Sequence, residues 1–151
     1  MSESRWANAL MSGLVGATAL TIIHETVRRL RSDAPRMDTL GRRAIARSME
    51  AAGIEPPGKD GLQATALAGD MVSNALYYSL VGLGKPSGSL ARGAALGAVA
   101  GLGAVALPPM IGLGSKPGLR TPQTAVMTVS WYLAGGLAAG AAHRGLGSIR
   151  R

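Results

Sequence analysis

The sequence predicts an all-α integral membrane protein, a four-helix bundle with one further amphipathic helix at the membrane surface. Four apolar blocks recur along its 151 residues. Each block is about 20 residues long, the length that a helix needs to cross the hydrocarbon core of a bilayer. With 22 Gly and 26 Ala but no Phe and no Cys, the chain cannot build an interior of large interlocking side chains or disulfides. We therefore expect residues 1–151 to form a single membrane domain.

The first predicted span covers residues 7–30. Residues 7–23 carry no charge, and the helical pattern continues to residue 30. Arg5 followed by an apolar run matches part of a secretory signal peptide. The acidic Glu3 ahead of the run and the basic residues after it favour a span that is retained.

The other three predicted spans cover residues 61–83, 87–107 and 122–143. Pro108 and Pro109 are expected to end the third span, because proline lacks a backbone donor and clashes with the preceding turn. Pro122 is placed to open the fourth span, where its missing N–H costs nothing. A soluble bundle stays open because the mean hydropathy is only +0.21. The first, third and fourth blocks lack the charged face of a soluble surface helix, which favours the membrane.

Residues 31–60 form the long connection between the first two spans. Within it, residues 38–52 predict an amphipathic helix that Asp38 caps and that ends at Gly53. Apolar residues occupy one half of its helical wheel and charged residues the other, which suits the headgroup plane of a membrane. The side chains expected to reach lipid phosphates are Arg42, Arg43 and Arg47. The same pattern also fits a helix packed on the end of the bundle or on a partner subunit.

The net charge of +8 comes from 13 Arg and 3 Lys against 8 acidic residues. This balance suits contact with anionic lipid headgroups or an acidic partner. Ten basic residues fall within residues 28–60 and 108–121, at the end of the first span and in the connections after the first and third spans, and six fall on the other side. The positive-inside rule then predicts that the 31–60 connection is cytoplasmic and that both termini are outside. Abundant Ala, Gly and Arg are typical of a GC-rich bacterium, so we expect its inner membrane as the location.

Composition disfavours several kinds of site. The absence of Cys excludes thiolate ligands, and the two histidines, His24 and His143, form no metal motif. The few, scattered aromatic residues do not make a base-stacking platform, so nucleic acid is not an expected partner. No catalytic-triad or nucleotide-binding pattern occurs in a suitable context. The sequence names no cofactor, and it favours a protein that is not an enzyme.

Rows of small residues four positions apart mark the third and fourth spans. Gly93, Gly97 and Gly101 share one face of the third span, and Gly136 and Gly140 share one face of the fourth. Lipid offers little hydrophobic drive between helices, so close backbone approach and dispersion contacts carry their association. Both helices are therefore expected to pack tightly against another helix. The spacing leaves open whether that helix belongs to the same chain, a second copy or another subunit.

A polar stripe interrupts the second span. Its members, within about 60° of one another on a helical wheel, are Gln63, Asp70, Asn74 and Tyr77. An ionised carboxylate deep in the membrane is expensive, so Asp70 must face protein or water, or be protonated. The stripe predicts either a site for an ion, proton or substrate, or hydrogen bonds that fix helix register. We expect Tyr132 of the fourth span to contact Asp70.

A second ionisable cluster ends the first span and consists of His24, Glu25, Arg28 and Arg29. It is not the H-E-x-x-H motif of zinc proteases, because that motif needs a histidine at position 28. Glu25 is spaced to pair with Arg28 or Arg29 along the helix. The functional alternative is that His24 and Glu25 bind a headgroup or pass protons toward the polar stripe.

Three functions remain open. The favoured one is a structural or accessory subunit that packs through its Gly-rich faces in a homo- or hetero-oligomeric membrane complex. The alternative is a small ion or proton channel or transporter, with a pathway lined by Gln63, Asp70, Asn74 and Tyr132. A membrane-embedded enzyme that acts on a lipid-like substrate would need the ionisable residues of both clusters. Expected partners are lipids and other membrane subunits.

Overall fold

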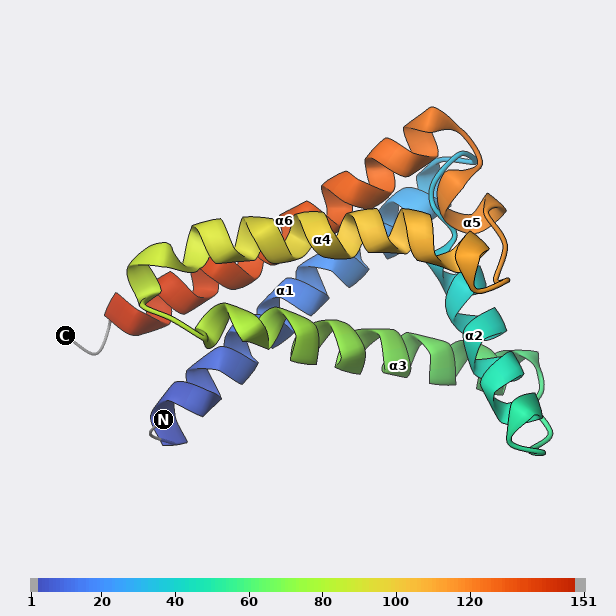
Figure 1. Cartoon of the computed structure of the whole chain (residues 1–151), viewed down its shortest axis with the longest axis horizontal. Coiled ribbons are helices and arrows are strands. Elements are labelled where there is room, and N and C mark those ends of the chain that lie inside the picture. The colour runs from blue at the N-terminus through green and yellow to red at the C-terminus, as the bar shows by residue number, and fades with distance from the viewer. Residues whose placement is uncertain (1–2, 149–151) are drawn as a thin grey trace.

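The computed structural model describes residues 3–148 and is helical along that range, with no strand in it (Figure 1). Its α-helices are α1 (Glu3–Leu30), α2 (Met37–Ala51), α3 (Lys59–Ser79), α4 (Ser89–Met110), α5 (Lys116–Leu119) and α6 (Pro122–Ser148). Two short 3-10 helices join α3 to α4, η1 (Leu80–Gly82) and η2 (Pro86–Gly88). The all-α prediction is confirmed.

Three helices are long and apolar enough to cross a membrane, namely Ser4–Leu30, Pro86–Met110 and Pro122–Ser148. They correspond to the first, third and fourth predicted spans. The second predicted span is helical as α3, but α3 is not one of the three. Its polar side chains, Asp70 among them, dilute its apolar character below that of its neighbours. Length and composition thus support three spans where the sequence pattern predicted four.

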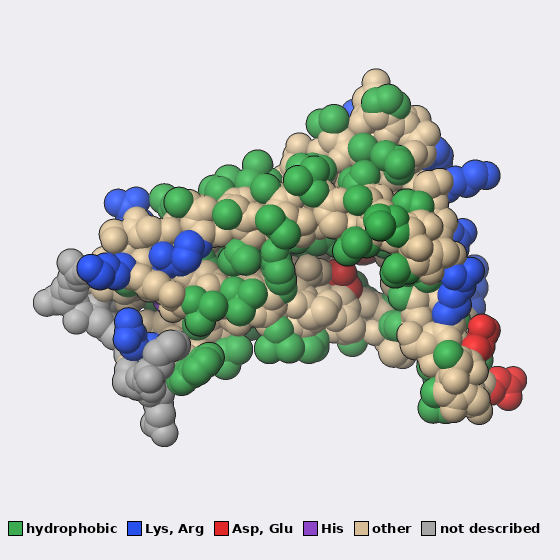
Figure 2. All heavy atoms as spheres, viewed as in Figure 1, with side chains coloured by type: hydrophobic (Ala, Val, Ile, Leu, Met, Phe, Trp, Pro, Cys, Tyr) green, Lys and Arg blue, Asp and Glu red, His purple; other side chains and the backbone are tan. Residues whose placement is uncertain are grey.

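Four helices, α1, α3, α4 and α6, run along the long direction of the molecule, and α2 crosses one end of it (Figure 1). The two ends of the chain and the α3–α4 connection lie at the opposite end. Lys and Arg side chains gather at the two ends, and hydrophobic side chains cover the length between them (Figure 2). This distribution fits a molecule that crosses a bilayer along its long direction.

The end of the third predicted span needs correction. The helix α4 continues through Pro108 and Pro109 to Met110 instead of ending before them. The turn still closes, because the carbonyl oxygens of Leu107 and Pro108 accept from the N–H groups of Ile111 and Leu113, at 3.1 and 2.8 Å. A proline lacks only its own backbone N–H. Its carbonyl oxygen can still accept a hydrogen bond, as that of Pro108 does at the end of α4. The fourth span begins at Pro122 as expected and runs on to Ser148.

The glycine rows of α4 and α6 face each other within this chain. A Cβ built on Gly93 would lie 2.2 Å from the Gly136 carbonyl oxygen, and one on Gly97 would lie 2.5 Å from the carbonyl oxygen of Tyr132. Gly140 lies similarly close to Ser89, whose hydroxyl donates to the Gly140 carbonyl oxygen at 2.7 Å. The backbones of the two helices are therefore in direct contact, and no side chain fits between them.

The helix α1 packs between α3 and α6. A Cβ on Gly13 would lie 2.1 Å from the Ala75 carbonyl oxygen, and one on Gly16 would lie 2.7 Å from that of Gly135. Next to these contacts, the fully buried Tyr78 donates its hydroxyl to the Tyr132 carbonyl oxygen at 2.7 Å. Together with Tyr78, the core contains Leu20, Val81 and Trp131. These contacts hold α1, α3 and α6 closely together around Tyr78.

The amphipathic helix is confirmed as α2, but its predicted cap is wrong. The N-cap is Arg36, and no side chain caps the helix. Asp38 lies inside the first turn, where its carboxylate pairs with Arg36 and Arg42. At the other end, Gly53 has a φ of +71°, a left-handed conformation that favours glycine. The helix therefore stops next to Gly53, as expected.

Two of the three arginines predicted to bind headgroups hold α2 against the chain itself. Arg43 donates to the Leu113 carbonyl oxygen at 3.0 Å, and Arg47 donates to that of Gly112 at 2.6 Å. Arg42 turns inward and donates to the side-chain oxygen of Gln63. Headgroup binding stays a prediction for Arg43 and Arg47, whose side chains remain exposed. For Arg42 it also stays a prediction, although its guanidinium already donates to Gln63 and Thr39.

Candidate functional site

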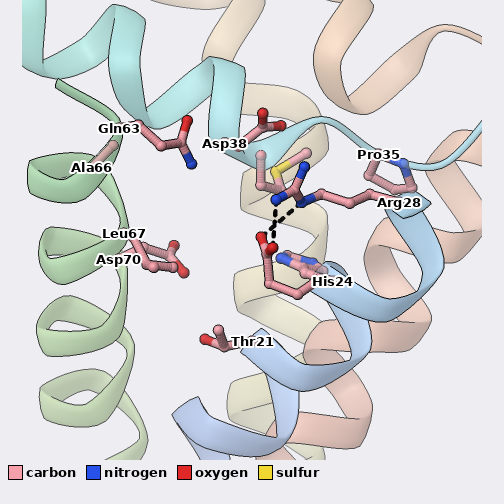
Figure 3. A pocket seen from close by; sticks show the side chains of 11 residues that line it. Thr21, His24, Arg28, Pro35, Asp38, Gln63, Ala66, Leu67 and Asp70 are labelled. Atoms are coloured by element: carbon pink, nitrogen blue, oxygen red, sulfur yellow. Dashed lines mark hydrogen bonds and ion pairs between the residues drawn. The ribbon is translucent and has the colours of Figure 1, made fainter. Parts of the chain in front are cut away.

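A small polar chamber lies where α1, the start of α2 and α3 meet (Figure 3). The polar residues that line it include Thr21, His24, Glu25, Asp38, Gln63 and Asp70. Its volume is about 30 Å³, which corresponds to about one water molecule. Figure 3 shows Gln63 and Asp70 reaching from α3 toward the side of α1 that carries Thr21 and His24. The chamber thus joins the two ionisable clusters that the sequence analysis treated separately.

Helical spacing explains why these side chains converge. Thr21, His24 and Arg28 are separated by three and four residues, so they lie on one face of α1. Gln63 and Asp70 are two turns apart and share one face of α3. The chain between α1 and α3 folds back through α2, which brings these two faces toward each other. Neither helix alone could have shown that they meet.

Two carboxylates of the chamber are already neutralised by arginines. Glu25 accepts from both arms of Arg28, with Nε 2.7 Å from Oε1, and it lies 3.7 Å from Arg29. This is the pairing that the spacing on α1 predicts. Asp38 lies 3.2 Å from Arg36 and 3.5 Å from Arg42. Both acids are therefore tied to the structure and are poor candidates to bind a cationic group.

The environment of Asp38, outside the membrane-spanning helices, sets its ionisation. Burial acts to raise the pKa of this carboxyl, but the hydrogen bond and charge of Arg36 act against burial, as do the Thr39 backbone N–H and the charge of Arg42. The net result is a pKa below the ordinary value of 3.8. Asp38 is thus ionised at neutral pH and holds the start of α2 through its arginines.

Within the described part of the chain, Asp70 forms no ion pair with a basic side chain. Its carboxylate accepts one hydrogen bond, from Asn74 Nδ2 at 3.0 Å to Oδ1. Two further polar atoms of the chamber, Thr21 Oγ1 and His24 Nε2, are buried without any hydrogen-bond partner. The His24 ring packs against Trp131, with ring centroids 5.0 Å apart. Leaving buried polar atoms unpaired costs about 1–3 kcal/mol each, so these atoms mark a place where something polar fits.

A larger groove opens on the other side of Asp70. It lies between α2, α3 and α4 and has a volume of about 630 Å³, and a hollow is visible there between α3 and α4 beside α2 (Figure 2). Its walls are mainly apolar, with Val99, Ala104 and Leu107 among the residues of α4. Asp70 is the acidic residue among those that line it. Asp70 thus borders both the chamber and the groove.

The polar stripe is divided between these two spaces. Gln63 lines the chamber, Asn74 and Tyr77 line the groove, and Asp70 lines both. The Tyr77 hydroxyl donates to the Leu96 carbonyl oxygen at 3.0 Å and so ties α3 to α4. The other expected members of the site, the His24 cluster, lie at the chamber except for Arg29, which is exposed.

The expected contact between Tyr132 and Asp70 needs correction. Both residues line the groove, but the one hydrogen bond of the Asp70 carboxylate comes from Asn74 on its own helix. The Tyr132 ring packs instead against His24, with ring centroids 5.9 Å apart. A partner four residues away on the same helix is always within reach of Asp70. A contact with Tyr132 depends instead on the distance between α3 and α6.

Thr21 is the residue that sequence reasoning missed. A threonine in an apolar span carries little signal, because its hydroxyl can bond to the carbonyl oxygen one turn back along its own helix. Its position four residues before Glu25 could have placed it on the same face as the ionisable cluster. Asp38 was also missed as a chamber residue, because a helix start looks like a capping position in sequence.

No group of three or more His, Cys, Asp or Glu side chains that could hold a metal ion occurs in the described range 3–148. Comparisons of the chain with protein-family models, with curated proteins and with solved structures find no match. Its function therefore has to be inferred from the chemistry of the chamber and the groove.

Proposed function

We propose that this is a four-span membrane protein in which α3 is the second crossing. Support comes from where the ends of α3 lie. It begins beside α2 at one end of the molecule and leads to α4 at the other end (Figure 1). A bilayer crossed by α1, α4 and α6 would then be crossed by α3 as well. Its 21 residues span about 31 Å as a helix, which matches the hydrocarbon core.

In this arrangement α2 lies at the surface and faces the cytoplasm. Both long connections with their ten basic residues lie at the α2 end, and the positive-inside rule places that end in the cytoplasm. Arg150 and Arg151, which count toward the six basic residues of the other end, lie outside the described residues. We propose the inner membrane of a bacterium as the location.

We propose further that the protein is an accessory subunit that receives one transmembrane helix of a partner in the groove. The observation that carries this proposal is Asp70, a half-buried acid of the groove that has no basic partner among residues 3–148, whereas Glu50, Glu55 and Asp60, which also form no ion pair there, are exposed. An unpaired carboxylate in lipid is costly. A lysine or arginine on a partner helix would neutralise it, and the apolar walls would bury the rest of that helix.

The groove replaces the glycine faces as the proposed contact with a partner. Gly93, Gly97, Gly101, Gly136 and Gly140 are all buried, and the two rows pack on each other. They are therefore occupied within the chain. Association with other subunits then depends on surfaces away from the α4–α6 contact.

The test uses two synthetic membrane-spanning peptides in vesicles, a Leu-rich helix with one central lysine and the same helix with leucine there. Energy transfer between labelled peptide and protein reports binding. The lysine peptide should bind the wild-type protein, and Asp70→Asn should weaken this about tenfold, equivalent to about 1.4 kcal/mol. Asp33→Asn, at an acid outside the groove, should change nothing. Equal binding of both peptides, or no effect of Asp70→Asn, would refute the proposal.

An ion or proton pathway is the second candidate, because the chamber and the groove meet at Asp70. Against it, buried Leu20, Tyr78 and Val81 fill the interior toward the chain ends. The purified protein in liposomes distinguishes the two functions. Proton or cation flux that Asp70→Asn abolishes would favour the pathway, and vesicles that stay impermeable would favour the accessory subunit.

A further inference from the structure

The chamber behind Asp70 contains buried polar atoms that have no hydrogen-bond partner among residues 3–148. His24 is 8% exposed, and its Nε2 atom is buried without a partner. The Thr21 hydroxyl is in the same state. Across from them, the Asp70 carboxylate uses one hydrogen bond from Asn74. The two helices thus bring two unpaired polar atoms and an incompletely bonded carboxyl group to the lining of one small pocket (Figure 3).

The volume of the chamber limits which molecule can occupy it. Its volume of about 30 Å³ is about that of one water molecule in the liquid, and buried waters need two to four polar partners. A lipid headgroup is much larger, and the described residues offer no cluster of metal-ligating side chains here. Water fits both the volume and the supply of donors and acceptors.

We propose that the chamber holds one water molecule between Thr21 Oγ1, His24 Nε2 and the Asp70 carboxyl group, and that this water lets Asp70 and His24 share one proton. Each ligand contributes a different capacity. The hydroxyl of Thr21 can donate or accept, the imidazole nitrogen of His24 can accept, and a protonated Asp70 can donate. The site shares Asp70 with the groove proposed for a partner helix, but its water and its proton are tested on the protein alone.

The charged groups around His24 determine where that proton can go. On α1 they are Glu25 and Arg28, which pair with each other. Asp38 of α2 is held by Arg36 and Arg42. From α6, Trp131 and Tyr132 contribute rings without charge. This leaves Asp70 as the carboxyl group of the chamber that has no cation beside it.

The proton transfer is balanced and needs no further reagent. The Asp70 carboxylic acid gives its proton to the water oxygen, and the water gives one of its own protons to His24 Nε2. The products are a carboxylate, an unchanged water molecule and an imidazolium ion. The charge pair so formed is neutral overall, which limits the cost of creating charge inside the membrane. The chamber then stores one proton at either of two positions.

Thr21→Val tests for the water, because valine has the shape of threonine but no hydroxyl. If the chamber holds water, this change removes one of its partners, and the thermal unfolding midpoint in detergent should fall by about 2–4 °C. If the chamber is dry, the change removes an unsatisfied buried hydroxyl, and the midpoint should rise. Thr18→Val, at an exposed position of the same helix, is the matched control. A rise with Thr21→Val overturns the proposal.

The shared proton is tested on the protein alone in nanodiscs of neutral phospholipid. The His24 ring is followed by 15N NMR, and the Asp70 carboxyl group by its infrared C=O band, as pH is varied. Coupling means that Asp70→Asn moves the pH midpoint of His24 by about one unit or more, and that His24→Gln moves the midpoint of Asp70 similarly. Asp33→Asn should move neither.

Two independent titrations, unchanged by substitution of the other residue, would show that no proton is shared. Because His24→Gln alters a buried residue and can impair folding, the Asp70→Asn measurement on an intact His24 is decisive by itself. The proposal also survives or fails apart from the peptide-binding experiment, because neither measurement here contains a partner helix.

Discussion

Two neighbouring tyrosines show how strongly burial and hydrogen bonding differ between adjacent positions of one helix. Tyr78 is fully buried and donates to the Tyr132 carbonyl oxygen, whereas Tyr77 is half-buried and donates to that of Leu96. Tyr78→Phe should lower the free energy of unfolding by about 1 kcal/mol, because a buried hydrogen bond is lost. Tyr77→Phe should cost less, since its surroundings are more exposed. Unfolding in a graded series of denaturing detergent measures both.

The carboxyl group of Asp38 gives the fold a pH dependence. Its pKa in the folded protein is below 3.8, so ionised Asp38 stabilises the folded state at every pH above its unfolded value. This stabilisation is lost as the pH falls through the folded pKa. We therefore expect the unfolding midpoint to drop in the acid range below about pH 4. Asp38→Asn should have a lower unfolding midpoint at pH 7. In the acid range, its unfolding midpoint should depend less on pH than that of the wild-type protein.

At the scale of residues, the sequence predicts contacts within one helix better than contacts between helices. The pairing of Glu25 with Arg28 follows from their spacing and is confirmed. The predicted contact between Tyr132 and Asp70 is wrong, because it depends on how α3 and α6 are placed relative to each other, and Asp70 accepts from Asn74 on its own helix instead. Thr21 was missed for the same reason, since its role appears only when α3 is placed opposite α1.

At the scale of elements, the close contact between α4 and α6 predicts how Gly→Ala substitutions in α6 change stability. A Cβ on Gly136 would lie 2.1 Å from the Gly93 carbonyl oxygen, so Gly136→Ala forces the two backbones apart. We expect it to cost about 1–3 kcal/mol of stability. Gly145→Ala, on the same helix with nothing within 4 Å, should instead stabilise α6 by about 0.5–1 kcal/mol. A neutral Gly136→Ala would contradict the observed packing.

The periodicity of apolar residues and the Pro and Gly residues at helix boundaries identify the helices. Composition does not decide which of these helices cross the membrane. All four apolar blocks form helices, and Pro122 and Gly53 mark boundaries as expected. Because of its polar residues, α3 is the one of these four helices without a stretch apolar enough to be a candidate span. Those residues are also the ones that line the chamber and the groove. The polar residues that lower the hydropathy of α3 are thus the same residues that line its candidate functional site.

At the scale of the whole molecule, close helix contacts and the two candidate spaces occupy different parts of the fold. Gly13 and Tyr78 lie where α1, α3 and α6 pack closely. At the α2 end, the Arg43 and Arg47 hydrogen bonds hold the connections together, while α3 stands away from α4 and leaves the groove. The close contacts fix α1, α3 and α6 relative to one another, and the chamber and the groove lie beside them toward α2.

The number of crossings is the last property that the fold predicts. Because the chain has no Cys, single cysteines can be introduced and labelled with a membrane-impermeant thiol reagent in intact cells and in inverted vesicles. If α3 crosses the bilayer, Ser87→Cys and Ser148→Cys label from one side, and Ser48→Cys and Ser115→Cys label from the other. The ten basic residues at the α2 end predict that the second pair is cytoplasmic.

Position 87 distinguishes four crossings from three. If α3 lay in the headgroup plane, Ser87 would label from the same side as Ser48, because the chain between them would not traverse the bilayer. With α4 and α6 both crossing, Ser148 would then also label with Ser48. Ser115, after α4, would then label from the side opposite Ser48, whereas four crossings place Ser48 and Ser115 on the same side. Labelling of Ser87 together with Ser48 would remove α3 from the membrane, and with it the proposed burial of Asp70 in a lipid-facing groove.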